Sequence, residues 1–330
     1  MSRRKIEILD STLRDGAQGE GISFSVSDKL NIVKALDSFG IDFIEAGNPG
    51  SNPKDMEFFQ QAVNLELMHA KLCAFGSTCR SGIHPKDDKN IQALVDSGTD
   101  TLVIFGKTWD LHVKKVLNIS LDDNLNIVEK TISYLKSLNK YVIFDAEHFF
   151  DGYKSDSDYA MRVLEHAIKG GADVLTLCDT NGGSLPNEVE ALTKKVVSAF
   201  PHAKVSIHCH NDSGCAVANS MISVDAGASQ VQGTFIGIGE RCGNADLSVI
   251  LPNLKLKMGY DCNGDISQLY SVTRRIADFS NTQIDNNKPY VGKSAFAHKG
   301  GMHIDGVLKV HASFEHVDPE SVGNKRKFLM

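Results

Sequence analysis

Short apolar segments of strand length alternate with longer amphipathic segments along most of the chain. Several of the short segments, such as residues 101–105, are almost continuously apolar, which is typical of parallel strands buried on both faces. The longer segments repeat apolar residues at helical spacing, and glycines such as Gly40 and Gly98 stand where helices should end. We expect eight strands, over residues 5–9, 42–46, 71–75, 101–105, 141–144, 173–177, 204–208 and 230–235.

Eight strand-then-helix units in about 255 residues match the number and length of a (β/α)8 barrel. A doubly wound open sheet is the alternative, but it usually has fewer strands and a glycine-rich first turn, which residues 12–18 lack. After residue 260 the alternation stops, although apolar positions at helical spacing over residues 266–276 indicate one further helix. We therefore predict an α/β protein: a (β/α)8 TIM barrel over residues 1–260 and a short, mainly helical C-terminal subdomain over residues 261–330.

Composition narrows the class of protein. The 330 residues are 42% hydrophobic and 23% charged, which is ordinary for a soluble globular protein. The net charge of −6 leaves no basic excess for nucleic acid, and no apolar run approaches the ~20 residues of a membrane helix. The basic start lacks the apolar core of a signal peptide, and seven scattered cysteines fit a reducing compartment. We expect a cytoplasmic protein with no nucleic-acid partner and no membrane association.

Polar residues gather where the expected strands end. In a TIM barrel the catalytic groups come from the carboxyl ends of the strands and the loops that follow them. The residues at these positions that carry suitable chemistry are Arg14, Asp15, Glu147, Thr180, His208, His210 and Asn244. The starts of the strands show no such gathering, so we expect the active site at the carboxyl-end face.

The most specific single feature is the segment His208-Cys-His210. Residues two apart on a strand point to the same side, so both imidazoles should face the mouth of the barrel. Two such imidazoles, with a carboxylate such as Asp15 and an oxygen from Asn244, are typical ligands of a divalent metal with open positions. From these residues alone, a hydrogen-bonded pair of core histidines or an acid–base pair remains an alternative.

Several other polar residues have a structural interpretation, in place of a catalytic one or beside it. Glu45 lies within an apolar strand and needs a partner, because a lone buried carboxylate is costly; Arg14 is the expected partner, which makes Glu45 structural support. The segment Glu147-His148 is either a catalytic pair or a solvated loop. His112 and His303 stand alone in the sequence, and isolated histidines are more often structural.

The motifs, taken in order, resemble one enzyme family. Arg14-Asp15, Glu45, His208-x-His210 and residues 239–244 resemble the metal-dependent Claisen-condensing and lyase barrels. That family contains isopropylmalate, homocitrate and citramalate synthases and hydroxymethylglutaryl-CoA lyase. The stretches that resemble the citramalate synthase branch more than the isopropylmalate branch are residues 10–25, 45–55, 144–153 and 295–305.

The resemblance implies a metal centre. Asp15, His208 and His210 match the divalent-metal ligands of the family, and Asn244 matches a further ligand position in the synthases. The ion implied is Mg²⁺, Mn²⁺ or Zn²⁺, because oxygen and imidazole ligands suit all three.

The resemblance also implies roles around the metal. Arg14 matches the residue that steadies the keto oxygen, and Thr180 matches a position that binds the carboxylate of the keto acid. Glu147 and His112 match active-site positions of the synthases. His303 matches a catalytic histidine that reaches the site of the partner subunit, which implies a homodimer.

The implied reaction condenses acetyl-CoA with pyruvate and water to give citramalate and CoA, in branched-chain amino acid biosynthesis. The alternatives are the same condensation on a larger 2-keto acid, as in 2-isopropylmalate or homocitrate synthases, and carbon–carbon cleavage, as in the lyase. Relatives in this branch carry more sequence, including a regulatory domain. Because the chain ends at Met330, we expect that domain to be absent.

Overall fold

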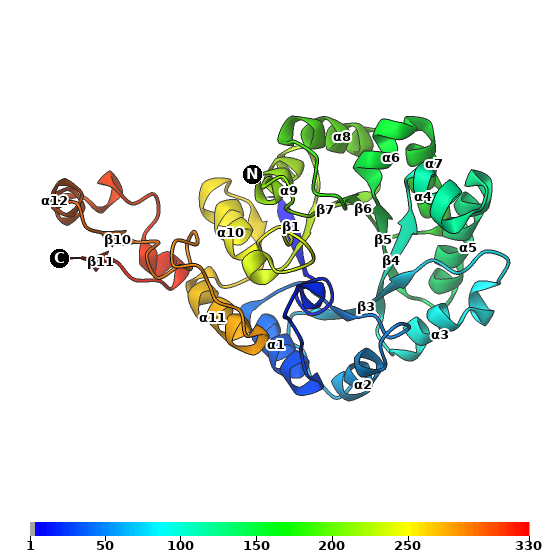
Figure 1. The fold of residues 1–330 in the computed structure, drawn as a ribbon, viewed down its shortest axis with the longest axis horizontal. Helices are drawn as coiled ribbons and strands as arrows, with labels where there is room; N and C mark the ends of the chain where they lie inside the picture. Colours follow the sequence, from blue (N-terminus) through cyan, green and yellow to red (C-terminus); the bar gives the residue numbers. More distant parts are fainter. Residues whose placement is uncertain (1–3, 330) are drawn as a thin grey trace.

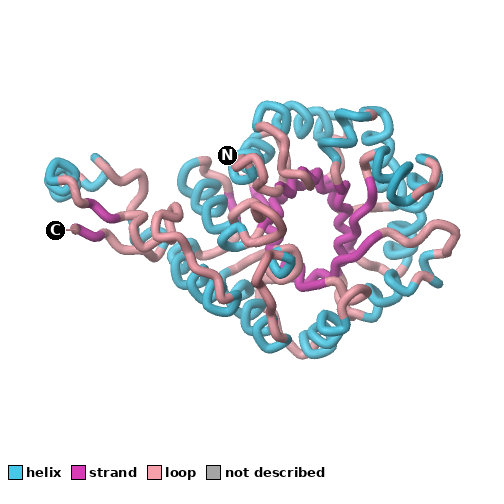
Figure 2. Tube along the Cα trace, in the orientation of Figure 1, coloured by secondary structure: helices cyan, strands magenta, loops and turns pink. Residues whose placement is uncertain are grey.

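A computed structural model describes residues 4–329, and its centre is a closed ring of eight parallel strands. The strands follow one another around the ring in chain order, and pairing of the first strand with both the second and the eighth closes it. Figure 2 shows the ring with the helices outside it. The strands are β1 (Lys5–Asp10), β2 (Phe43–Gly47), β3 (Lys71–Ser77), β4 (Thr101–Lys107), β5 (Tyr141–Glu147), β6 (Val174–Asp179), β7 (Lys204–Cys209) and β8 (Gln230–Gly233). The predicted TIM barrel is confirmed.

Helices separate the strands and cover the outside of the barrel (Figure 1). Large apolar side chains pack between the two layers, and this cluster is the main core of the protein. The helices of the barrel are α1 (Val26–Phe39), α2 (Pro53–Ala62), α3 (Lys89–Asp96), α4 (Asp110–His112), α5 (Leu121–Ser137), α6 (Phe149–Ser155), α7 (Ser157–Gly170), α8 (Pro186–Ala199), α9 (Ala216–Asp225) and α10 (Leu247–Pro252). Among residues 4–329, no helix is long and apolar enough to cross a lipid bilayer.

A second, smaller apolar cluster fills the interior of the barrel. Its fully buried members are Leu9, Phe43, Cys73, Val103, Ile143 and Val174, which point inward from six different strands. Two residues further along several strands, the inward positions become polar, because the side-chain period of a strand is two. The apolar cluster therefore closes the barrel below the carboxyl ends of the strands and leaves a polar chamber above.

The predicted helix end at Gly40 is confirmed, and a serine caps the start of another helix. Gly40 follows α1 with a φ of 99°, which side chains rarely adopt, and its N–H caps the last turn. The hydroxyl of Ser120 accepts a hydrogen bond from the N–H of Asp123 at the start of α5. Ser184, which lies shortly before α8, does not cap it: Leu185 precedes the helix, and the hydroxyl of Ser184 donates instead to Asp179 Oδ1, at 3.0 Å.

The eighth strand is shorter than predicted. It ends at Gly233, and Phe235–Gly237 forms a 3-10 turn in place of the expected strand residues. The chain turns away because the N–H of Thr234 bonds to the carbonyl of Ala245, and because Ile236 takes a φ of 67°. The apolar side chain of Phe235 remains buried, which explains why the sequence pattern resembled a continuing strand.

The expected further helix is present as α11 (Leu269–Ser280) and packs against α1. After it, residues 285–329 form an arm. Its base packs against the barrel through residues such as Lys288 and Tyr290, and its outer part, with α12, extends away from the barrel (Figure 1). The arm contains α12 (Gly301–Lys309) and a small pair of strands, β10 (Ala297–His298) and β11 (Lys327–Phe328). Much of its apolar surface is exposed: Met302, Leu308 and Val310 are 84%, 67% and 61% accessible.

Candidate metal centre and active site

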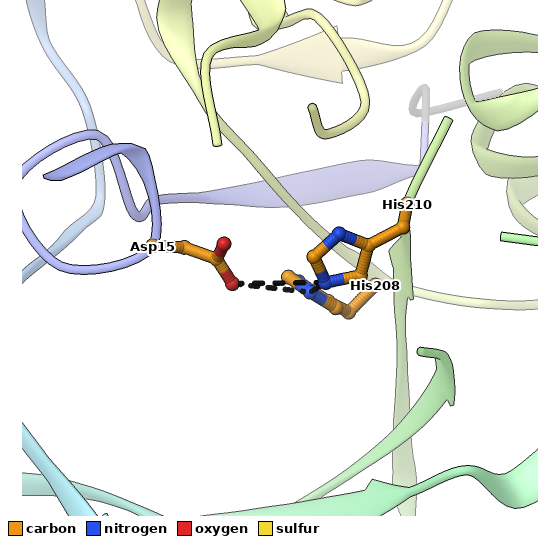
Figure 3. Close-up of side chains that lie close together, drawn as sticks. All are labelled: Asp15, His208 and His210. Atoms are coloured by element: carbon orange, nitrogen blue, oxygen red, sulfur yellow. Dashed lines mark hydrogen bonds and ion pairs between the residues drawn. The ribbon is translucent and has the colours of Figure 1, made fainter. Parts of the chain in front are cut away.

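Three side chains converge at the mouth of the barrel (Figure 3). His208 Nε2 and His210 Nε2 lie 3.6 and 3.9 Å from Asp15 Oδ2, and the two nitrogens lie 3.4 Å from each other. Atoms that bind one ion at about 2.1 Å lie about 3.0–3.4 Å apart, so a small inward movement would bring all three to bonding distance. This trio is a group of buried potential metal ligands in the described chain.

The local structure explains why these atoms meet. His208 lies in β7 and His210 lies directly after it, so the period of two turns both rings to the same side, as the sequence predicts. Asp15 lies in the turn that follows β1, just before a short 3-10 helix over Gly16–Gln18. Because β1 and β7 both pair with β8, these turns lie close together at one end of the barrel.

The charges of this trio suit a cation. Burial raises the pKa of Asp15, but the charges of Arg14 and the two imidazoles outweigh it and hold that pKa well below its usual value. Burial lowers the pKa of His208 to about 3 and also lowers that of His210. An ionised carboxylate therefore faces two neutral imidazoles, the protonation states in which these groups bind metals.

Asn244 stands beside the trio. Its Nδ2 donates to Asp15 Oδ1 at 3.0 Å and to the carbonyl of Ile238 at 3.1 Å. Its Oδ1 is buried and has no hydrogen-bond partner among the described residues, as expected of a group that awaits a cation. Gly239 permits this arrangement, because a Cβ there would lie 2.2 Å from Asn244 Nδ2.

The expected partnership between Arg14 and Glu45 is confirmed. Arg14 Nε donates to Glu45 Oε1 at 2.5 Å, and Ser11 donates to the same oxygen at 2.6 Å. The guanidinium also donates from Nη1 to Asp15 Oδ2 at 2.9 Å and lies over the ring of Phe75, 3.8 Å from its centroid. Arg14 is therefore held on three sides, and its charge lies next to the potential metal ligands.

The trio and Arg14 form one end of a cavity. The described residues that line it are Arg14, Asp15, Gln18, Phe75, Phe105, Asp145, Glu147, Cys178, Thr180, His208, His210 and Glu240. Glu147 forms an ion pair with Lys107 on the neighbouring strand. The hydroxyl of Thr180 accepts the N–H of His148, at 2.8 Å, and so links the loops after β5 and β6.

Four of the predicted residues are not among those that line the cavity: Asn244 and Glu45, described above, and His112 and His303. His112 stacks on Trp109, with ring centroids 5.2 Å apart. The ring centroids of His112 and His148 are 4.4 Å apart. His303 lies on α12 in the arm and stacks on Phe314, 4.1 Å between centroids. Figure 1 shows α12 well away from the mouth of the same barrel.

Asp145 also lines the cavity, although it was not among the predicted site residues. Its Oδ1 accepts a hydrogen bond from Gln232 Nε2 at 2.9 Å, and Gln232 also donates to Thr176 at 2.9 Å. Burial, followed by the charge of Glu45, raises its pKa to about 7. The sequence contains a signal for this position. Asp145 lies two residues before Glu147 on the same strand, so both side chains point into the barrel.

A carboxylate, two imidazoles and an arginine at the mouth of a TIM barrel are the arrangement that the motifs predicted. The sequence model of the HMGL-like family matches residues 5–276, and that of the homocitrate synthase post-HMGL domain matches residues 290–330. The chain belongs to the HMGL-like family.

Curated relatives of this HMGL-like chain cover nearly all of its residues. It is 53% identical over 328 residues to an (R)-citramalate synthase of Aquifex aeolicus, which covers 99% of the chain and 62% of the relative. It is 47% identical to an (R)-citramalate synthase of Sulfolobus acidocaldarius, over 100% of the chain and 64% of the relative. A 2-isopropylmalate synthase of the same organism is 35% identical, over 100% of the chain and 83% of the relative. The chain thus spans less than two thirds of the length of these citramalate synthases.

Solved structures confirm the fold. An HMG-CoA lyase from Bacillus subtilis superposes with a TM-score of 0.73 at 20% identity, over 86% of this chain and 97% of that one. An HMG-CoA lyase from Pseudomonas aeruginosa gives a TM-score of 0.72 at 21% identity, over 86% and 95%. At these identities the likeness shows the shared barrel.

Removing one imidazole should strongly weaken cation binding. We expect His208→Ala to weaken Mn²⁺ binding more than about 100-fold. Loss of a residue that only hydrogen-bonds to a metal ligand already lowers metal affinity about 10–100-fold. Isothermal titration with MnCl₂ measures this. The exposed His202→Ala on the loop before β7 is the matched control and should bind like the parent. Equal affinity in His208→Ala would exclude this histidine as a ligand.

Asp145 should make stability depend on pH. Its pKa rises from 3.8 to about 7 on folding, so the folded chain holds an extra proton between these values and loses stability as the pH rises through them. Asp145→Asn keeps the acceptor for Gln232, and should flatten this decline by as much as about 1.4 kcal/mol per pH unit. Urea unfolding at pH 5, 6 and 7 measures the slope. The exposed Asp96→Asn should leave it unchanged; an unchanged slope in Asp145→Asn would contradict the prediction.

Proposed function

We propose that this HMGL-like protein condenses acetyl-CoA with pyruvate and water to give citramalate and CoA. The observation that carries the proposal is the gap in identity: curated (R)-citramalate synthases are 45–53% identical over nearly the whole chain, whereas 2-isopropylmalate synthases are 35–36% identical. We further propose a cytoplasmic enzyme of branched-chain amino acid biosynthesis. Its seven free cysteines accord with a reducing compartment.

The metal ligands in this proposal are Asp15, His208 and His210, with Asn244 as a fourth. The convergence of three buried ligand atoms and the unpartnered oxygen of Asn244 support this set. A divalent cation bound there would polarise the keto group of the acid and make its carbon electrophilic. Mg²⁺, Mn²⁺ and Zn²⁺ all accept such ligands.

Arg14 stabilises the charge that develops on the keto oxygen. When the new carbon–carbon bond forms, this oxygen becomes an alkoxide, and a fixed guanidinium beside it lowers the energy of that state. Arg14 needs no rearrangement for this task, because Glu45 and Phe75 already hold its side chain. Thr180, on the cavity wall, binds the carboxylate of the keto acid.

A base must remove a methyl proton from acetyl-CoA. Glu147 is the candidate within the chain, because it lines the cavity and its carboxylate lies beside Lys107. The other candidate is His303, which one chain does not bring to its own cavity. The arm that carries it extends from the barrel with exposed apolar side chains, such as Met302 and Leu308. We propose that this arm docks on a second copy and delivers His303 to the partner's site.

The keto acid should be identified by a direct assay. We expect Mg²⁺ or Mn²⁺, acetyl-CoA and pyruvate to release CoA thiol, with kcat/KM for 2-oxoisovalerate at least about tenfold lower, since one or two extra methyl groups shift transition-state binding by about 1–3 kcal/mol. Free thiol followed with a disulfide reagent measures the rates, and excess chelator is the blank. Thiol release with 2-oxoisovalerate or 2-oxoglutarate but not pyruvate would overturn the assignment. Cleavage of hydroxymethylglutaryl-CoA without condensation would favour a lyase.

Subunit complementation tests the role of the arm. Glu147→Gln and His303→Ala should each be nearly inactive alone. In a two-fold dimer that mixes at random, half the dimers are hybrids with one intact site each, so co-expression should restore about a quarter of the parent activity. Co-expressed Glu147→Gln and Asp15→Asn are the matched control, since both defects lie in the barrel and no intact site can form. Absence of recovery in the first pair would show that His303 does not act across subunits.

A further inference from the structure

The loop after β8 stores backbone strain next to the metal centre. Between Thr234 and Asp246 the chain takes left-handed φ angles at Ile236 (67°), Gly237 (75°), Arg241 (54°) and Gly243 (82°). For a β-branched residue such as Ile236 this conformation is rare and costs about 1–3 kcal/mol. Such strain persists only where surrounding contacts restrain the loop.

One lysine from outside the barrel contributes to that restraint. Lys288 Nζ donates to the carbonyl of Ile236 at 2.6 Å and forms an ion pair with Asp246 Oδ2 at 2.7 Å. The ammonium therefore joins the two ends of the strained loop. The carboxylate of Asp246 is 8% exposed, and the lysine side chain is 22% exposed, so water screens this pair only weakly.

The arm determines where Lys288 lies. The carbonyl of Lys288 accepts the N–H of Gly292 at 2.9 Å, and a Cβ on Gly292 would lie 2.3 Å from the carbonyl of Asn286. This tight turn is held from the far end of the chain, because Asn324 Nδ2 donates to the carbonyls of Tyr290 and Gly292 at 2.8 and 3.1 Å. Hydrogen bonds of this short turn therefore connect Lys288 to the C-terminal part of the arm.

The same loop contains Asn244, the fourth proposed metal ligand. The N–H of Asn244 bonds to the carbonyl of Gly237 at 3.0 Å, and Asn244 forms a bridge with His210. Its amide in turn donates to Asp15 Oδ1. The backbone of Ile236 is therefore linked to that of Asn244 through its chain neighbour Gly237.

We propose that Lys288 is a positioning residue that joins the base of the C-terminal arm to the strained β8 loop and so sets the position of Asn244 at the metal centre. The inference rests on the proposed function in that it takes this trio and Asn244 as the metal site. It goes beyond that function by making the geometry of the site depend on the arm: docking or release of the arm changes cation affinity without contact between the arm and the cation.

Lys288→Met removes the charge and keeps most of the side chain. We expect faster amide hydrogen exchange over residues 235–246 and about tenfold weaker Mn²⁺ binding. This is the lower end of the loss in metal affinity, about 10–100-fold, that follows removal of a residue supporting a metal ligand. Lys288→Arg keeps the charge and should restore both to within about threefold. Lys293→Met is the matched control, because this exposed lysine lies on the same turn and its ammonium has no partner among the described residues. It should match the parent in both measurements.

The measurements need no substrate, so they separate the two proposals. Parent protein that binds Mn²⁺ but condenses no keto acid would refute the proposed reaction, while Lys288 would still be judged by exchange and affinity. Unchanged exchange over 235–246 in Lys288→Met would overturn the positioning role. So would faster exchange with unchanged Mn²⁺ affinity, since the loop would then be loosened without effect on Asn244. Equal weakening in Lys293→Met would also overturn it, because the effect would not belong to Lys288.

Discussion

The buried ion pair between Arg14 and Glu45 is the interaction on which the site depends. Glu45 is inaccessible to water and lies on a strand among apolar residues, so without Arg14 its charge would have no compensation. The same guanidinium donates to Asp15, which keeps that carboxylate ionised and directed toward the two imidazoles. One arginine thus serves the stability of the barrel and the electrostatics of its mouth.

The layering of the barrel interior explains why the site lies where it does. Inward side chains from six strands form the apolar cluster of Leu9 and Ile143, and further toward the carboxyl ends the inward side chains include Glu45, Asp145 and His208. The apolar layer excludes water from below, which strengthens every charge interaction above it. The result is a chamber where an anion, a cation and neutral imidazoles coexist, and where Asp145 titrates near neutrality.

Much of this arrangement was predictable from the sequence. Eight strands, the shared face of His208 and His210, and the pairing of Arg14 with Glu45 follow from periodicity and from the cost of a buried charge. The end of β8 was not predictable in this way. The buried Phe235 continues the apolar pattern of the strand, whereas the turn is imposed by a bond between Thr234 and Ala245 across the loop.

The sequence by itself determined the barrel, the face on which polar groups gather and the chemistry those groups carry, because each depends on residue types a few positions apart. The tertiary structure decided the individual contacts between groups that lie far apart in the chain. Asp15 and Asn244 are separated by 229 positions yet share a hydrogen bond, and Lys288 reaches Ile236 across 52 positions. Such contacts arise when the barrel closes and the chain folds back on it, and local periodicity carries no information about either event.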